Sequence, residues 1–273
     1  MIELDKSRRV RVVAEVTDVR ASSPRMRRIT LGGAELAAFL QANGVETPAA
    51  WVKVSLPGGE KRAYTIRGID RQAGTLDLEF VLHGEYAAPG PASAWASRAR
   101  IGERIGIAGP RDGGFALPAD ARWVLLAGDA TALPAIQTIA QALPPGIRAE
   151  VCVELHSQDD RQDIASRAGI EVAWLQEHGA TPGIALLQTL AKRPLPNGPG
   201  YVWIAGESNA VRALRAHYLD ARGLEARRVS ARGYWKTGEA AHRDRGANAG
   251  VAPTLRWMWS WFRGMRGASC PPA

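Results

Sequence analysis

The hydrophobic pattern of this chain changes type near residue 118, and that change constrains the fold more than any other feature. Before it lie short runs rich in Val, Ile and Leu, often alternating with polar residues and separated by turn clusters such as LPGGEKR. The runs cover residues 10–19, 26–31, 51–56, 62–67, 75–83 and 104–108. Short, closely spaced strands of this kind are typical of an antiparallel barrel or sandwich.

After Pro118 the apolar runs become continuous and alternate with helical stretches. The expected strands are residues 122–127, 149–154, 170–175 and 200–205, and the expected helices are residues 133–143, 183–192 and 208–222. Strands that are apolar on both faces and alternate with helices predict a doubly wound parallel sheet. We place the boundary between the two domains within residues 116–121, so that they cover residues 1–118 and 119–240.

A polar, Gly/Ala-rich segment begins at residue 238 and predicts a linker to a tail, residues 241–273. The tail sequence TLRWMWSWFRGMRG places Trp and Arg side by side. If it were helical, it would resemble an interfacial amphipathic segment that makes weak membrane contact. The alternatives are a tail that docks on its own protein and an incidental extension.

Composition excludes several classes of protein. The formal net charge is +8, but part of the excess lies in the tail, and the two main blocks lack a basic face with stacking aromatics, which argues against a nucleic-acid partner. The sequence contains no apolar run of about 18 residues, the length that spans a membrane as a helix. It also shows no signal peptide for secretion. The two cysteines, Cys152 and Cys270, form neither an iron–sulfur motif nor a disulfide framework, so we expect a cytoplasmic protein.

The motif RAYTIR at residues 62–67 carries the first candidate site. Arg62 and Tyr64 are two residues apart on an expected strand and therefore project from one face, while Thr65 points to the other. A guanidinium can bind a diphosphate, an aromatic ring can stack on a flat heterocycle, and a hydroxyl can bind a ring nitrogen. These groups suit a flavin dinucleotide, although a half-buried strand tyrosine is an equally ordinary interpretation of Tyr64.

Three further segments have glycine or small residues where a strand or loop meets a helix. Gly90–Ser93 (GPAS) begins a short helix that could approach a phosphate, with Ser93 supplying a hydroxyl. The segment LAGDATALP (126–134) joins a strand to a helix but lacks the dinucleotide fingerprint GxGxxG. The segment YVWIAGES (201–208) repeats that geometry, with Gly206 permitting close approach and Glu207 facing the crevice.

These segments, in this order, match a known family. RxYTxR lies at 62–67, VLHG at 81–84, GPASxWA at 90–96, GDxTALPAI at 128–136, WIAGES at 203–208 and GYWK at 233–236. The chain resembles the siderophore-interacting proteins, FAD-dependent ferric-siderophore reductases related to the ferredoxin reductases. The resemblance covers roughly residues 8–240 and implies an N-terminal antiparallel six-stranded β-barrel FAD-binding domain, followed by a doubly wound parallel α/β nicotinamide-binding domain.

The resemblance implies a role for each matching residue. Arg62 would bind the FAD diphosphate, Tyr64 would pack on the isoalloxazine, and Thr65 would bind near its reactive nitrogen as a catalytic residue. The remaining flavin contacts would come from Val81, His83, Gly90, Ala92 and Ser93. The strand ends that approach the nicotinamide would contribute Asp129, Thr131, Ala132 and Glu207. The basic residues expected beside the iron chelate are Lys53, Lys236 and Arg111, and Lys236, where the family commonly has Arg, would also be catalytic.

The implied function is the reduction of ferric siderophores, with electrons from NAD(P)H, to release Fe(II), which binds hard oxygen donors less tightly. A flavin suits this reaction because it accepts a hydride and passes electrons on singly. The alternatives are a general NAD(P)H–flavin or ferredoxin-linked oxidoreductase and a non-catalytic siderophore- or flavin-binding module. For the choice of nicotinamide, Glu154 would favour NADH if it faced the ribose, whereas Ser157 and Arg161 would accept a phosphate.

Overall fold

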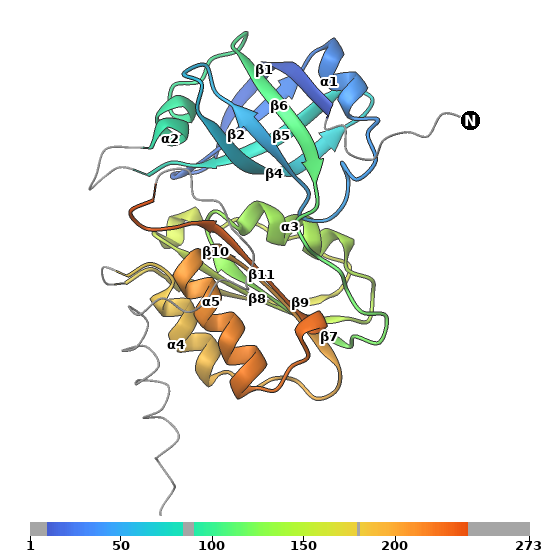
Figure 1. Ribbon diagram of the computed structural model, residues 1–273, viewed down its shortest axis with the longest axis vertical. Helices are drawn as coiled ribbons and strands as arrows, with labels where there is room; N and C mark the ends of the chain where they lie inside the picture. Colours follow the sequence, from blue (N-terminus) through green and yellow to red (C-terminus); the bar gives the residue numbers. More distant parts are fainter. Residues whose placement is uncertain (1–9, 84–89, 179–180, 240–273) are drawn as a thin grey trace, which may run out of the picture.

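The computed structural model describes residues 10–83, 90–178 and 181–239. The expected tail (241–273) and Gly84 of the VLHG element lie outside the described residues. A barrel formed by the first part of the chain sits on an open sheet formed by the second (Figure 1). No helix in the described ranges is long and apolar enough to cross a membrane.

The first part of the chain forms a closed six-stranded antiparallel barrel with the order β1-β2-β5-β4-β3-β6, which confirms the expected barrel domain and decides between barrel and sandwich. Its strands are β1 (Val10–Ser23), β2 (Met26–Gly32), β3 (Trp51–Ser55), β4 (Lys61–Asp70), β5 (Thr75–Val81) and β6 (Arg104–Arg111). Helix α1 (Ala34–Phe39) follows β2 and was not expected. Helix α2 (Pro91–Ala96) begins where the GPAS segment predicts it, with Pro91 in the first turn.

The ladder between β4 and β5 covers only part of β4. The two strands pair from Ile66↔Leu78 to Asp70↔Thr75, with one irregularity before Gly68. The preceding part of β4, residues 61–65, pairs with β3 alone. The edge of β4 that carries the RAYT motif is therefore not covered by a β5 ladder, and the start of α2 follows β5 nearby in the chain.

The second part of the chain forms a parallel five-stranded sheet with the order β11-β10-β7-β8-β9. The strands are β7 (Trp123–Asp129), β8 (Arg148–Leu155), β9 (Gly169–Gln176), β10 (Gly200–Glu207) and β11 (Val229–Trp235). Helix α3 (Leu133–Ala142) packs into one core cluster of the sheet, while α4 (Ile184–Lys192) and α5 (Ser208–Ala216) pack into the cluster on the other face. This arrangement confirms the doubly wound parallel sheet.

Strand burial follows position in the sheet. Every residue of β10 is buried, whereas β9 at one edge is mostly half-buried or exposed. Strand β11, at the other edge, was not among the expected strands because Arg232 and Gly233 interrupt its apolar pattern. A 3₁₀ turn (Gln158–Asp160) follows β8, a single π-helical stretch (His217–Ala221) extends α5, and a second 3₁₀ turn (Ala226–Arg228) precedes β11.

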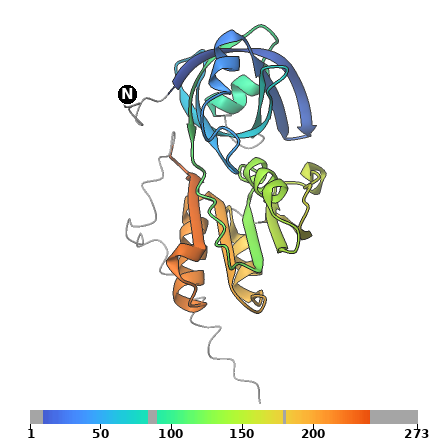
Figure 2. The ribbon, with the colours of Figure 1, turned by 90° about the vertical axis from the view of Figure 1, so that its right-hand side faces the viewer.

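Polar contacts fix the barrel on the sheet. The Asp160 carboxylate, almost fully buried, accepts hydrogen bonds from the Ser23 hydroxyl and the Arg25 amide, both at 2.8 Å. On α3, the Thr138 hydroxyl accepts the Ala49 amide at 2.9 Å. In Figure 2 the blue β1–β2 hairpin and the green α3 lie toward one side of the molecule, and the orange β11 lies toward the other. The junction between the two domains therefore has one side next to the β1–β2 hairpin and α3 and another next to β11.

Candidate functional site

The register of β4 against β3 decides which way the RAYT side chains point. Residues opposite one another in an antiparallel pair share a face of the sheet. Arg62 lies opposite Val54 and Tyr64 opposite Val52, and both valines are buried in the barrel core. Arg62 and Tyr64 therefore share the inner face, as their spacing predicts. Thr65 lies on the other face and is 7% exposed.

Tyr64 stands at the end of an aromatic row. Its ring centroid lies 4.0 Å from that of Phe80, which in turn meets Trp95 edge-on at 5.4 Å. Arg62 donates to the Lys61 carbonyl at 3.0 Å, and within the described residues it makes no ion pair. A half-buried guanidinium without a carboxylate partner leaves most of its donors for a ligand. The inner face of this end of β4 thus offers a ring and a cation together.

The start of α2 is tied to the end of β5 by Ser93. The Ser93 hydroxyl accepts the His83 amide at 3.0 Å and donates to the His83 carbonyl at 3.1 Å. This hydroxyl therefore already has backbone partners, as a buried hydroxyl needs, and the role of Ser93 toward a phosphate stays a prediction. The backbone amides of Ala92 and Ser93 in the first helical turn have no partner within the helix.

Gly90 and His83 crowd each other at the same place. A Cβ on Gly90 would lie 3.3 Å from the Cε1 atom of the His83 ring, tighter than ordinary van der Waals contact. Partial burial lowers the pKa of His83, so the imidazole is neutral at pH 7. The structure thus places His83 beside the GPAS turn. Val81 and Tyr234 both pack against the core cluster that includes α3.

The strand-end residues Asp129 and Glu207 lie on neighbouring strands and are used to hold backbone. Asp129 accepts the Thr131 amide at 2.9 Å on one oxygen, and the Glu207 amide at 2.9 Å and the Trp235 indole at 2.8 Å on the other. Burial raises the pKa of Asp129, and these bonds oppose that rise. Gly206 permits the approach with a φ of +140°, since a Cβ there would lie 2.5 Å from the Asp129 carboxylate. Gly206 thus lets the end of β10 approach the Asp129 carboxylate closely.

Glu207 is the N-cap of α5. Its carboxylate accepts the amides of Asn209 at 2.6 Å and Ala210 at 3.1 Å, and it also accepts the Thr237 amide at 3.3 Å. Ala132, fully buried, packs under Gly128, where a Cβ would lie 2.5 Å from the Ala132 methyl group. The residues expected near a nicotinamide therefore shape the edge of the sheet, and their carboxylates hold the segment after β11 in place.

The GYWK motif contains two aromatic residues, Tyr234 and Trp235, that were not among the expected site residues. The Tyr234 hydroxyl is buried beside Thr65 and has no hydrogen bond of normal geometry to any described residue. Burial raises the pKa of Tyr234 to about 12. An unpaired buried hydroxyl beside Thr65 is a place where a bound group could supply the missing partner. The sequence offered one indication of a role for Tyr234, because it lies two residues before Lys236, which was an expected site residue.

The basic residues expected beside an iron chelate fall into two groups. Arg111 lies over the Trp51 ring at 4.7 Å, and Lys53 is on the same face of β3 as Trp51. Lys236 follows β11 and forms an ion pair with Glu239 across a short bridge. The described residues contain no cluster of His, Cys, Asp or Glu able to hold a metal ion as a resident group.

The structure excludes one proposed determinant of nicotinamide choice. Glu154 is 4% exposed and accepts the amides of Gly183 at 2.7 Å and Leu186 at 2.9 Å, so it caps α4 and does not face a ribose. A buried carboxylate needs such donors, and the N-terminus of α4 supplies them. Arg161 instead lies at the surface with its guanidinium on the Gln158 side chain.

Comparison with known proteins decides the family. Residues 121–238 match the siderophore-interacting protein family, and residues 58–114 match the siderophore-interacting FAD-binding domain. The chain belongs to the siderophore-interacting protein family. It is 32% identical to ferric vibriobactin reductase ViuB of Vibrio cholerae, over 67% of this chain and 68% of that protein.

Solved structures agree with this membership. A siderophore utilization protein from T. fusca is 30% identical, with a TM-score of 0.75 over 87% of this chain and 97% of its own. The siderophore-interacting protein SipS from Aeromonas hydrophila is 26% identical, with a TM-score of 0.71 over 94% and 98%. The ferredoxin reductase of carbazole 1,9a-dioxygenase and the cytochrome P450 reductase GcoB of Amycolatopsis, 18% and 19% identical to this chain, share its fold.

Proposed function

We propose that this protein binds FAD at the junction of β4, α2 and β11 and reduces ferric siderophores with electrons from NAD(P)H. The observation that carries the proposal is the set of unsatisfied groups at the end of β4. Arg62 has no ion-pair partner among the described residues, and the buried Tyr234 hydroxyl beside Thr65 has no hydrogen bond.

These groups fit the parts of a flavin dinucleotide. Arg62 offers a guanidinium fork to a diphosphate, and the first-turn amides of Ala92 and Ser93 are donors of the kind that phosphates accept. Tyr64 offers an aromatic face at the stretch of β4 that β5 does not pair. Thr65 and Tyr234 supply hydroxyls on the other face of the strand, where a ring nitrogen or carbonyl could be bound.

When bound, FAD supplies the conversion of a two-electron hydride donor into single-electron delivery. The chain itself needs to bind the donor and the acceptor and to keep the reacting edge ordered. Asp129 and Glu207 keep this edge ordered, because together they hold Trp235 and Thr237 at the carboxyl ends of β7 and β10. Ligands bind at this edge in doubly wound sheets, which supports it as the place where a nicotinamide approaches.

The positive charges near the proposed site support a ferric siderophore as the electron acceptor. Lys53, Arg111 and Lys236 are cations on the outer face of β3 and β6 and just after β11. Ferric siderophores whose donors are ionised oxygens carry negative charge, and cations attract such complexes. The names of the ViuB relative and the two solved structures point to the same class of substrate.

The test is direct. Purified protein mixed with FAD and freed of excess should keep a yellow flavin spectrum, and NADPH or NADH should bleach it without oxygen. A ferric catecholate should then restore the colour and release Fe(II), which a ferrous chelator detects. Protein that retains no FAD would contradict the proposal, and flavin that is bleached but not restored by any ferric chelate would contradict the siderophore step.

A further inference from the structure

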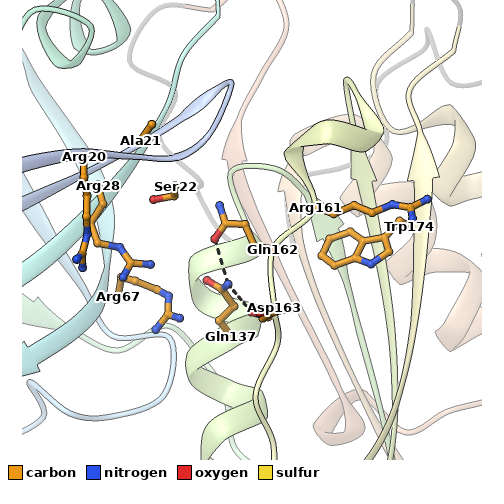
Figure 3. Close-up of a pocket in the computed structure, with 10 residues that line it drawn as sticks. All are labelled: Arg20, Ala21, Ser22, Arg28, Arg67, Gln137, Arg161, Gln162, Asp163 and Trp174. Carbon is orange, nitrogen blue, oxygen red and sulfur yellow. Dashed lines mark hydrogen bonds between the residues drawn. The ribbon is translucent and has the colours of Figure 1, made fainter.

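A polar cavity lies between the barrel and the sheet, lined by residues of both domains. Its volume is about 610 Å³, within the range usual for small-molecule sites. Figure 3 shows the guanidinium groups of Arg20, Arg28 and Arg67 gathered on the barrel wall, with Trp174 on the opposite wall. The Arg161 side chain lies beside Trp174 and extends away from these three arginines. None of the residues assigned above to FAD or to the chelate lines this cavity.

The barrel wall keeps an excess of positive charge after its internal pairs are counted. Arg28 is committed to Glu79, with a nitrogen–oxygen distance of 2.8 Å, and lies 3.9 Å from Asp77. Arg20 reaches the same Asp77 at 3.7 Å and is more than half exposed. Arg67 has no direct carboxylate partner within the described residues, and its Nε atom is buried without a hydrogen bond.

The opposite wall comes from the α/β domain. On α3, Gln137 donates to the Gln162 side chain at 3.2 Å and to the Asp163 carbonyl at 3.0 Å, shown as dashed lines in Figure 3. These bonds orient the Gln137 amide, yet its own side-chain oxygen is buried and unpaired. Trp174 on β9 is half-buried and gives this wall an aromatic surface.

Four arginines and one aspartate line the cavity, together with a tryptophan. Arginine forks match phosphate oxygens bidentately, and indole rings stack on flat heterocycles. We propose that this cavity binds a phosphorylated small molecule of nucleotide size, with its phosphates on Arg67 and Arg20 and its base on Trp174. Such a ligand would bridge the two domains on the side away from β11, and the proposal does not depend on the function proposed above.

The experiment measures binding of ADP, AMP, adenosine and pyrophosphate to the whole protein by isothermal titration calorimetry. ADP should bind saturably, at least tenfold more tightly than adenosine, which lacks phosphate, or pyrophosphate, which lacks the base. Binding should weaken several-fold when salt rises from about 50 to 300 mM, because these side chains reach solvent. Equal affinity for ADP and pyrophosphate would overturn the role of Trp174.

Two variants and one control locate the site. Arg67→Gln and Arg20→Gln should each weaken ADP binding tenfold or more. Arg20 is more than half exposed, so its loss tests the site even if Arg67→Gln folds poorly. Arg227→Gln removes an equal charge from an exposed residue paired with Glu225 elsewhere and should leave ADP binding unchanged.

ADP also resembles half of a nicotinamide dinucleotide, and the variants separate the two cases. ADP bound at the carboxyl edge of β7 and β10 would be insensitive to Arg67→Gln, and that result would overturn the proposal, as would the absence of saturable binding. The FAD content of Arg20→Gln is measured in the same samples. Wild-type levels of FAD with weakened ADP binding are expected, whereas loss of FAD from wild type would contradict only the function proposed above.

Discussion

The indole Nε1 of Trp235 donates to the Asp129 carboxylate at 2.8 Å, joining the last strand of the sheet to the end of β7. These two strands are not neighbours, because β10 lies between them. The same Asp129 oxygen accepts the amide of Glu207 at the end of β10. One carboxylate therefore fixes three strand ends at the edge where the proposed flavin site meets the sheet.

Replacing Trp235 by Phe should lower the free energy of unfolding by about 1.5–3 kcal/mol, because a hydrogen bond to a carboxylate is lost. The matched control is Trp51→Phe, whose indole donates to the neutral Asp112 carbonyl at 3.1 Å and should cost about 1 kcal/mol. Urea unfolding of both variants measures the difference. A Trp235→Phe cost no larger than that of Trp51→Phe would show that Asp129 does not hold β11.

Replacing Arg62 by Ala should weaken FAD binding roughly tenfold to a hundredfold, which corresponds to a charge-assisted contact of about 1.5–3 kcal/mol. The control is Lys61→Ala, since Lys61 is the adjacent, exposed cation on the other face of β4. Fluorescence titration with FAD measures both, and Lys61→Ala should change the affinity less than twofold. Equal losses in the two variants would mean that only net charge matters and that Arg62 does not contact the diphosphate.

Substitutions of Lys236 and of its partner Glu239 should change the KM for an anionic ferric chelate in opposite directions. Lys236→Ala should raise the KM for anionic ferric catecholates several-fold, and Lys236→Arg should restore it because the charge is kept. Glu239→Gln should lower that KM, since it releases Lys236 from its ion pair. Steady-state kinetics with charged and neutral ferric chelates, at low and moderate salt, measure all three variants.

Salt and chelate charge provide the controls for that series. Attraction between exposed charges is screened within about 8–10 Å at moderate ionic strength, so the differences should shrink as salt is added. Flavin reduction by the nicotinamide should stay the same throughout. Unchanged kinetics for Lys236→Ala with every chelate would leave the lysine with its structural pairing to Glu239 alone.

Cys152 should be chemically silent in the folded protein. Its side chain is fully buried in β8, and burial raises the pKa of its thiol to about 11, so at pH 8 the reactive thiolate is almost absent. In a Cys270→Ala variant, a disulfide reagent at pH 8 should modify no thiol until the protein is unfolded, and one thiol afterwards. Rapid modification of the native variant would show that β8 opens on that timescale.

The elements with strong hydrophobic patterns could be predicted from the sequence. The strands of the barrel and four strands of the sheet, β7 to β10, were expected within a few residues of their bounds, because strand burial imposes a period of two or a continuous apolar run. Strand β11 could not be predicted this way, since an edge strand tolerates Arg232 and Gly233. Its position follows from pairing with β10, which is a tertiary property.

The site was predicted as a set of segments, and the structure adds roles for side chains that the segments do not reveal. Ser93, Asp129 and Glu207, which were expected near ligands, also hold backbone amides close to a helix or strand end. The unpaired Tyr234 hydroxyl and the cavity around Arg67 arise from residues distant in the sequence. Sequence spacing contains no information on either.

The central claim is that electrons pass from a nicotinamide through a bound flavin to a ferric siderophore, and anaerobic stopped-flow spectroscopy tests it most directly. FAD-loaded protein is mixed first with NADPH or NADH and then with a ferric catecholate, while flavin absorbance and trapped Fe(II) are followed. We predict bleaching by a nicotinamide, then recovery of the flavin spectrum, with two Fe(II) formed per flavin reoxidised. A flavin that no nicotinamide bleaches, or that recovers without Fe(II) formation, would contradict the account.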